Sequence, residues 1–123
     1  MLKGGTSRIL VTGAVGQIGS ELTMTLRERY GGGQVVAAGH KTEPGPELRD
    51  SGPFVTIYVT RPETIEEVVD EYEIDTIYHL AAILSASGEK NPQLAWRVNL
   101  NGLYNVLEIA RKHNVRVLED FSQ

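Results

Sequence analysis

The chain has 123 residues, which is long enough for one compact domain with its own hydrophobic core. Its formal net charge is −4. It contains no cysteine, so disulfides and thiolate metal sites are both excluded. No apolar run approaches the roughly 20 residues of a membrane helix, and none follows Met1 as in a signal peptide. Its basic residues are scattered, which argues against nucleic-acid binding. We therefore expect a cytoplasmic domain without membrane or nucleic-acid partners.

Short apolar runs alternate with amphipathic segments along the chain. The runs are typical of strands buried in a parallel sheet, and strands are predicted at residues 9–11, 35–38, 54–59, 77–82 and 115–118. Between them, apolar residues at helical spacing predict three helices. The expected buried stripes are Ile18, Leu22, Leu26 and Tyr30 in the first, Ile65, Val68, Val69 and Tyr72 in the second, and Leu94, Ala95, Val98, Val106, Leu107 and Ala110 in the third.

Glycine, proline and capping residues mark the predicted boundaries. Three glycines at 31–33 end the first helix, since glycine accepts the backbone geometry found there. Residues 42–53 hold three prolines and two glycines and are predicted to be a loop, either a plain connection or the edge of an adenosine pocket. The other two helices each begin with a capping residue followed by proline, namely Thr60 with Pro62 and Glu63 in a capping box, and Asn91 with Pro92.

Strands that alternate with helices predict right-handed crossovers and a parallel sheet covered on both faces. The expected fold is a Rossmann-type, doubly wound α/β domain over residues 1–123, with strand order 3-2-1-4-5 and truncated after about the fifth strand. In such sheets a ligand binds at the carboxyl ends of the strands where the order reverses, here between the first and fourth strands.

A glycine-rich segment connects the first strand to the first helix. Gly13 suits a tight turn, Gly16 lets a pyrophosphate approach the backbone, and Gly19 lets the helix pack closely on the strand. The N–H groups of the first helical turn, at Gln17 and Ile18, then face the anion, which the helix dipole also favours. The alternative is an ordinary glycine-rich turn, but its place between a buried strand and an amphipathic helix favours dinucleotide binding.

The Gly-x-x-Gly-x-x-Gly spacing resembles the short-chain dehydrogenase/reductase superfamily, and its extended branch of NAD-dependent epimerases and dehydratases most of all. Residues 79–82, His-Leu-Ala-Ala, are similar to that branch's fourth-strand motif, and Val98-Asn99 with Asn101-Gly102 is similar to its helix signature. The loop at 82–90 is similar to that of short-chain L-threonine 3-dehydrogenases. The resemblance covers residues 8–116 and implies NAD or NADP as cofactor.

The resemblance and the glycine loop together give a set of expected site residues. Ser85 is expected to touch the substrate of a full-length enzyme, or else is an ordinary loop serine. No metal ligand is expected, since the acidic stretch 63–73 has the pattern of a solvated helix face. The residues expected to contact the cofactor are Gly13, Gly16, Gln17, Ile18, Gly39, His40, Lys41, Tyr58, Val59, Leu80, Ala81, Ala82 and Asn99.

Two positions depart from the pattern of NAD-preferring relatives. The acid that binds the ribose hydroxyls at the end of the second strand is replaced by Gly39, and His40 and Lys41 follow it. Tyr58 stands where the family places an aspartate near the adenine. A carboxylate at position 39 would repel a 2′-phosphate, whereas Lys41 neutralises one. The sequence therefore favours NADP, or weak binding of either cofactor.

The catalytic Tyr-x-x-x-Lys pair of the superfamily is absent, because none of the five tyrosines has a lysine four residues later. Ser122 is not taken as the family's catalytic serine, since Glu119 and Asp120 break the apolar strand before it. We therefore expect no catalytic residue in this chain. The pattern indicates an incomplete enzyme or a sequence that results from a shifted reading frame. Three hypotheses stay open: the cofactor domain of a dehydrogenase, a non-catalytic NAD(P)-sensing module, and a folded remnant without a ligand.

Four further residues have plain structural interpretations. His79 is expected to be a hydrogen-bonded core histidine, and His113 to favour the dipole at the end of the last helix. Trp96 and Tyr104 lie eight residues apart and can share one helix face, in the core or in an interface. A homodimer is therefore a candidate assembly.

Overall fold

The computed structural model describes residues 7–80 and 92–118, which form a five-stranded parallel sheet of order β3-β2-β1-β4-β5. This confirms the Rossmann-type order expected from the sequence. The strands are β1 (Ile9–Thr12), β2 (Val35–Gly39), β3 (Phe54–Thr56), β4 (Thr76–His79) and β5 (Arg116–Leu118). The helices are α1 (Gln17–Tyr30), a 3₁₀ turn η2 (Gly32–Gln34), α2 (Pro46–Asp50), α3 (Pro62–Glu71) and α5 (Pro92–His113).

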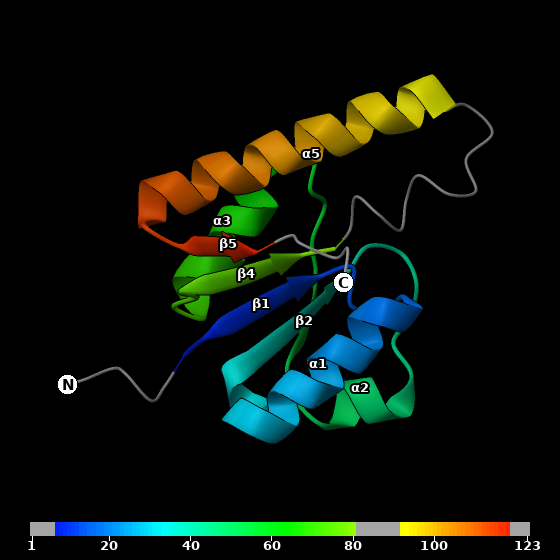
Figure 1. The fold of residues 1–123 in the computed structure, drawn as a ribbon, viewed down its shortest axis with the longest axis vertical. Helices are drawn as coiled ribbons and strands as arrows, with labels where there is room; N and C mark the ends of the chain where they lie inside the picture. Colours follow the sequence, from blue (N-terminus) through cyan, green and yellow to red (C-terminus); the bar gives the residue numbers. More distant parts are fainter. Residues whose placement is uncertain (1–6, 81–91, 119–123) are drawn as a thin grey trace.

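The sheet separates two hydrophobic cores, with α1 and α2 on one face and α3 and α5 on the other (Figure 1). Alternate residues of the central strand β1 serve the two cores: Leu10 joins the α3 and α5 side, while Ile9 and Val11 join the α1 side. All four residues of β1 are buried, as are all five of β2. Strands covered on both faces require continuous apolar runs, and such runs in the sequence predicted these two strands.

The capping box predicted at Thr60 is wrong. Helix α3 begins at Pro62 with Arg61 as its N-cap, and no side chain caps it. Strand β3 also ends earlier than predicted, at Thr56. The reason is a tight turn, in which the N–H of Arg61 donates to Tyr58 O at 2.7 Å and Thr64 Oγ1 accepts the N–H of Tyr58 at 3.1 Å.

The buried faces of α1 and α5 differ from the predicted stripes. Ile18 and Tyr30 are exposed in α1, and Leu94, Val98 and Leu107 are exposed in α5. The side chain of Ala95 lies outside the described residues. Leu26 in α1 and Val106 and Ala110 in α5 are buried as predicted. Ile109 is buried as well, and small or polar residues take the other buried positions, namely Gly19, Thr23 and Arg27 in α1 and Asn99, Gly102 and Asn105 in α5.

Two glycines show why small residues face the sheet. A Cβ at Gly19 would collide with the carbonyl oxygen of Gly13, so α1 packs directly on the turn before it. A Cβ at Gly102 would lie 2.6 Å from Cγ2 of Val59, so α5 packs equally closely on the segment after β3. Backbone approach of this kind decides which face is buried. The stripe of helix α3, in contrast, buries Ile65, Val68 and Val69 as predicted.

The segment 42–53 is not wholly a loop, because it contains α2. Pro46 begins this short helix in the position where a missing N–H costs nothing. Leu48 is buried against the α1 core and holds the helix in place. Among the described residues, no helix is long and apolar enough to cross a membrane.

A buried arginine connects α1 to the chain around α2. Arg27 donates to Val35 O at 3.0 and 3.1 Å, to Leu48 O at 2.6 Å, and to Pro53 O at 2.6 Å. A further bond goes to Ser51 Oγ at 2.9 Å. Burial lowers the pKa of Arg27, yet a guanidinium stays charged at neutral pH. Its donors satisfy carbonyl groups that would otherwise be buried without a partner.

We expect Arg27→Lys to lower the free energy of unfolding by about 2–4 kcal/mol, because three ammonium donors cannot reproduce the planar fork that bonds four acceptors. Urea unfolding followed by circular dichroism measures the loss. Arg29→Lys, on the exposed face of the same helix, is the matched control and should change stability little. Equal stabilities of the two variants would contradict the role given to Arg27.

Candidate functional site

A pocket of about 550 Å³ opens at the carboxyl ends of β1, β2 and β3. Its volume lies in the range of small-molecule and cofactor sites. Four segments line it: Thr12, Gly13, Val15 and Gly16 after β1; Ala38, Gly39, His40, Lys41 and Thr42 at the end of β2; Ile57, Tyr58, Val59 and Thr60 after β3; and Val98 and Asn99 of α5. This is the side of the sheet where ligands of doubly wound folds bind.

The glycine loop forms one wall of this pocket. Gly13 has φ of 68°, a left-handed conformation that favours glycine and makes the tight turn out of β1. The N–H of Ala14 donates to Ala38 O at 3.0 Å, which joins the loop to the end of β2. Gly16 is the N-cap of α1, with φ −69° and ψ 173°. Gln17 and Ile18 follow in the first turn of α1, exposed but outside the pocket lining.

The opposite wall carries an aromatic and cationic group that sequence reasoning found only in part. The rings of His40 and Tyr58 meet edge to face with centroids 4.8 Å apart. The guanidinium of Arg61 lies 5.7 Å from the centroid of the Tyr58 ring, in a cation–π contact. Arg61 was missed because it lies past the strand, although a cation three residues after a pocket aromatic was a signal in the sequence.

Position 39 is tighter than the sequence suggested. Gly39 is buried, and a Cβ there would lie 2.8 Å from both Phe54 Cζ and Val15 Cγ2. Both side chains would have to shift before a carboxylate could occupy this place. His40 and Lys41, in contrast, are exposed at the pocket edge and have room for substitution.

Thr12 and His79 form a buried polar pair at the ends of β1 and β4. Thr12 Oγ1 lies 2.9 Å from His79 Nδ1 and accepts the N–H of Leu80 at 3.0 Å. Burial lowers the pKa of His79 to about 4, so the imidazole is neutral near pH 7. His79 is therefore the hydrogen-bonded core histidine expected from the sequence. The pair fixes the point at which the chain leaves β4.

Helix α5 supplies the remaining wall through polar residues. Asn99 is buried and lines the pocket, as expected from the helix signature. Asn105 Nδ2 donates to Val59 O at 2.8 Å, which ties the segment after β3 to the helix. Together with the close approach of Gly102, this bond sets the distance between α5 and the pocket edge.

The structure brings most of the expected cofactor residues together around this pocket. Leu80 is buried in the α1 core rather than in the pocket lining. Ala81, Ala82 and Ser85 lie outside the described residues. Lining residues that sequence reasoning did not select include Thr12, Val15, Thr42 and Thr60, while the selected residues that line the pocket are Gly13, Gly16, Gly39, His40, Lys41, Tyr58, Val59 and Asn99.

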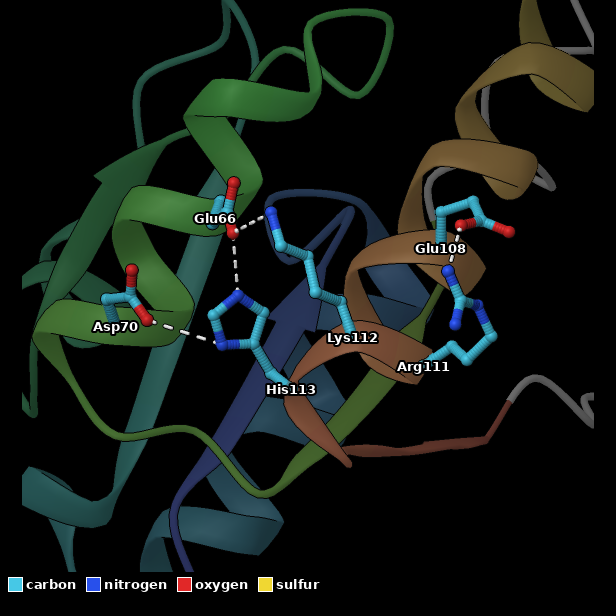
Figure 2. A network of polar contacts seen from close by, with 6 residues as sticks. All are labelled: Glu66, Asp70, Glu108, Arg111, Lys112 and His113. Atoms are coloured by element: carbon cyan, nitrogen blue, oxygen red, sulfur yellow. Dashed lines mark hydrogen bonds and ion pairs between the residues drawn. The ribbon is translucent and has the colours of Figure 1, made fainter.

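The acidic stretch 63–73 is more than a solvated face, because two of its carboxylates join α3 to the end of α5 (Figure 2). Glu66 Oε2 lies 2.7 Å from His113 Nε2 and 2.9 Å from Lys112 Nζ, and Asp70 Oδ1 lies 3.4 Å from His113 Nδ1. The hydrogen bond to His113, followed by that to Lys112, lowers the pKa of Glu66. Glu66, Asp70 and His113 lie close enough to share a metal ion, but here Lys112 and His113 already bond the carboxylates.

Residues 9–122 match the family model described as the NAD dependent epimerase/dehydratase family, and the chain belongs to this family. It is 44% identical over 108 residues to an uncharacterized epimerase/dehydratase of Staphylococcus haemolyticus, covering 88% of this chain and 34% of that protein. The resemblance predicted from the glycine spacing is confirmed.

Solved structures of L-threonine dehydrogenases are similar to this chain. The enzyme of Clostridium difficile aligns with a TM-score of 0.82 and 44% identity, over 91% of this chain and 35% of that one. A monomeric L-threonine 3-dehydrogenase from a metagenome aligns with a TM-score of 0.76 and 46% identity, over 89% and 34% of the two chains. The chain thus spans about a third of the length of the relatives it matches.

His79 should make stability depend on pH. Its pKa is about 4 when folded and 6.5 when exposed, so between these values the unfolded chain binds a proton that the folded chain does not. We expect the free energy of unfolding to fall by about 3 kcal/mol through this group as pH drops from 7 to 4. Urea unfolding across this range measures the slope. His79→Gln should flatten it and the exposed His40→Gln should not; equal slopes in parent and His79→Gln would contradict the assignment.

Proposed function

We propose that this chain binds a nicotinamide dinucleotide, with the pyrophosphate against the glycine loop at the start of α1. The observation that carries the proposal is the loop's position: Gly13 turns the chain out of β1, and Gly16, the N-cap residue of α1, lines a pocket of cofactor size. The first N–H groups of a helix have no partner within the helix, and its dipole favours an anion there. Family membership supports the same cofactor class.

The remaining pocket residues suit the other parts of such a cofactor. We assign the adenosine end to the wall of His40 and Tyr58, and the path toward the nicotinamide to Asn99 of α5. When bound, a nicotinamide accepts or donates a hydride. The chain's own residues bind and orient the cofactor, while Thr12 and His79 hold the floor of the pocket in place.

For the longer protein we propose oxidation of a secondary alcohol, because the neighbours with 41–46% identity are named as L-threonine dehydrogenases. Contact between Ser85 and this substrate stays a prediction, as does a cytoplasmic location. The chain itself has no Tyr-x-x-x-Lys pair, so an NAD(P)-sensing module without turnover is the second candidate. A turnover assay with L-threonine distinguishes the two, and absence of dinucleotide binding would leave a folded remnant.

We expect Gly16→Val to abolish dinucleotide binding. The backbone at Gly16, φ −69° and ψ 173°, is one that valine adopts freely, so the fold should survive while the branched side chain occupies the place of the pyrophosphate. Isothermal titration with NAD and NADP measures binding, and thermal unfolding checks the fold. Gly33→Val is the matched control, because a Cβ at Gly33 meets no atom within 4 Å. Binding of equal strength in Gly16→Val and parent would show that the site is wrong.

We further propose that the site prefers NADP. Gly39 leaves no carboxylate to repel a 2′-phosphate, and Lys41 lies exposed in the pocket lining. Arg61, which contacts Tyr58, adds a second cation at the same edge. A phosphate bonded to a lysine ammonium is a charge-assisted interaction, which is stronger than a neutral hydrogen bond.

Lys41→Gln should weaken NADP binding about tenfold or more and leave NAD binding nearly unchanged, since one charge-assisted bond contributes about 1.5–3 kcal/mol. Competition titrations with both cofactors measure the ratio. This exchange tests the site better than Gly39→Asp, which would force Phe54 and Val15 to move. Arg29→Gln removes a cation from α1 without touching the pocket and serves as control. A parent that strongly selects NAD would overturn the proposed preference.

We also propose that the chain assembles as a homodimer. The support is the exposure of Trp96 and Tyr104 on α5, since large aromatic side chains on a surface are typical of interfaces. One relative with 46% identity is described as monomeric, so the assembly of this chain needs its own measurement.

A further inference from the structure

Two carboxylates of α3 and the imidazole at the end of α5 form a cluster outside the dinucleotide pocket. Glu66 and Asp70 lie four residues apart on α3, so their side chains leave the same face of the helix. His113 is the last residue of α5, and its ring lies between the two carboxylates (Figure 2). One oxygen of each carboxylate and one ring nitrogen lie within 4.8 Å of one another. The three side chains thus bring metal-ligating atoms from two helices to one place.

The backbone beneath the cluster is held by the hydrophobic core. Ile65 and Val69, each directly before one of the two acids, are buried in the core between α3 and the sheet. The N–H of Val115 donates to Ala110 O at 2.8 Å, which closes the end of α5 directly after His113. The ligand atoms are therefore presented by packed helices, and sites built on helices are more precise than sites built on loops.

The charge around the cluster favours a cation. Helix α3, which the structure describes in full, has no basic residue in its last turn, where Asp70 and Glu71 lie at the negative end of the helix dipole. Lys112 supplies the positive charge in this structure, with its Nζ 2.9 Å from Glu66 Oε2. The lysine side chain is 61% exposed, and an ion pair this exposed stabilises a protein little. A metal ion can replace the ammonium, which then moves into solvent without becoming a buried, unpaired charge.

The ligand atoms of the cluster select the kind of ion. Imidazole suits Zn²⁺, Ni²⁺ and Cu²⁺, whereas Mg²⁺ and Ca²⁺ prefer oxygen ligands. Zinc binds histidine nitrogen and carboxylate oxygen at about 2.0–2.2 Å, so two ligand atoms of a tetrahedral site lie about 3.4 Å apart. Glu66 Oε2 lies 2.7 Å from His113 Nε2, and Asp70 Oδ1 lies 3.4 Å from His113 Nδ1. Small side-chain rotations therefore suffice to bring one ring nitrogen and both carboxylates to a common ion.

We propose that Glu66, Asp70 and His113 bind a divalent transition-metal ion of the zinc type. The ion joins α3 to the end of α5, and water completes its coordination. Because the unfolded chain does not hold the three ligands together, binding should stabilise the folded chain by mass action. None of the three residues belongs to the lining of the dinucleotide pocket, so the proposal stands apart from cofactor binding and from the homodimer.

Isothermal titration with zinc chloride tests the site. The parent should bind one Zn²⁺, and His113→Gln should weaken binding about tenfold or more, because even the loss of a residue that supports a metal ligand costs that much. His40→Gln is the matched control, since it removes an exposed imidazole elsewhere and should leave zinc affinity unchanged. Circular dichroism checks the fold of each variant. A parent that binds no zinc, or equal affinity in the parent and His113→Gln, overturns the proposal.

The competing ammonium gives a second test with the opposite sign. Lys112→Gln should tighten zinc binding several-fold, because the ion no longer has to displace the lysine from Glu66. Arg111→Gln is the matched control, since this neighbouring cation pairs with Glu108 instead (Figure 2). Weaker zinc binding in Lys112→Gln, or the same gain in Arg111→Gln, would contradict the site.

The carboxylates are tested on one helix. Glu66→Gln should weaken zinc binding and remove the rise in unfolding temperature that zinc gives the parent. Glu67→Gln, at the exposed neighbouring position, should keep both. Magnesium chloride at the same concentration should not raise the unfolding temperature of the parent, since the imidazole is a poor ligand for Mg²⁺. Equal losses in the two variants, or an equal effect of magnesium, would show only non-specific attraction of cations to an acidic helix and would overturn the proposal.

Discussion

The buried guanidinium of Arg27 is the interaction on which the α1 side of the domain depends. Within residues 7–80 and 92–118 it is a cation that bonds no carboxylate, held by backbone carbonyls of three separate segments and one serine hydroxyl. Gly52 lies so near that a Cβ there would sit 2.6 Å from Arg27 Nε. A buried charge is tolerated only when its donors are all used, so this side chain dictates how α1, β2 and α2 meet. The contacts of Arg27 also position the pocket wall at residues 39–42, because this wall continues directly from β2.

The other half of the pocket is positioned by contacts at the ends of strands. Thr12 and His79 join β1 to β4 inside the core, and Asn105 joins α5 to the carbonyl of Val59. The first bond is buried and the second partly buried, and each connects segments more than 40 residues apart in sequence. Loops that carry ligand contacts gain precision from such a rigid frame. The pocket is therefore shaped by polar pairs within the frame.

Sequence periodicity predicted what depends on local pattern and missed what depends on close approach. The strand order follows from apolar runs alternating with helices, and the tight turn at Gly13 follows from its place after a buried strand. The buried face of α5 follows only in part, because Val106 and Ala110 are buried as predicted while Gly102 and Asn105 rather than leucines make the contacts with Val59. The burial of a cation such as Arg27 cannot be predicted from a hydropathy pattern either. The contact between Arg61 and Tyr58 depends on a turn whose capping residue the sequence pattern placed wrongly.

The two faces of α5 explain why its hydrophobic pattern predicted several exposed residues to be buried. A helix that packs on one side alone shows one apolar stripe, and pattern reasoning assigns that stripe to the core. Here the inner face needs small and polar side chains, since the helix approaches Val59 closely and Asn99 faces the pocket. Trp96 and Leu100, among other large apolar residues of α5, consequently lie outside, while Val106 and Ile109 lie in the core. The same geometry that brings α5 near the pocket thus leaves an apolar surface on the other side of the helix.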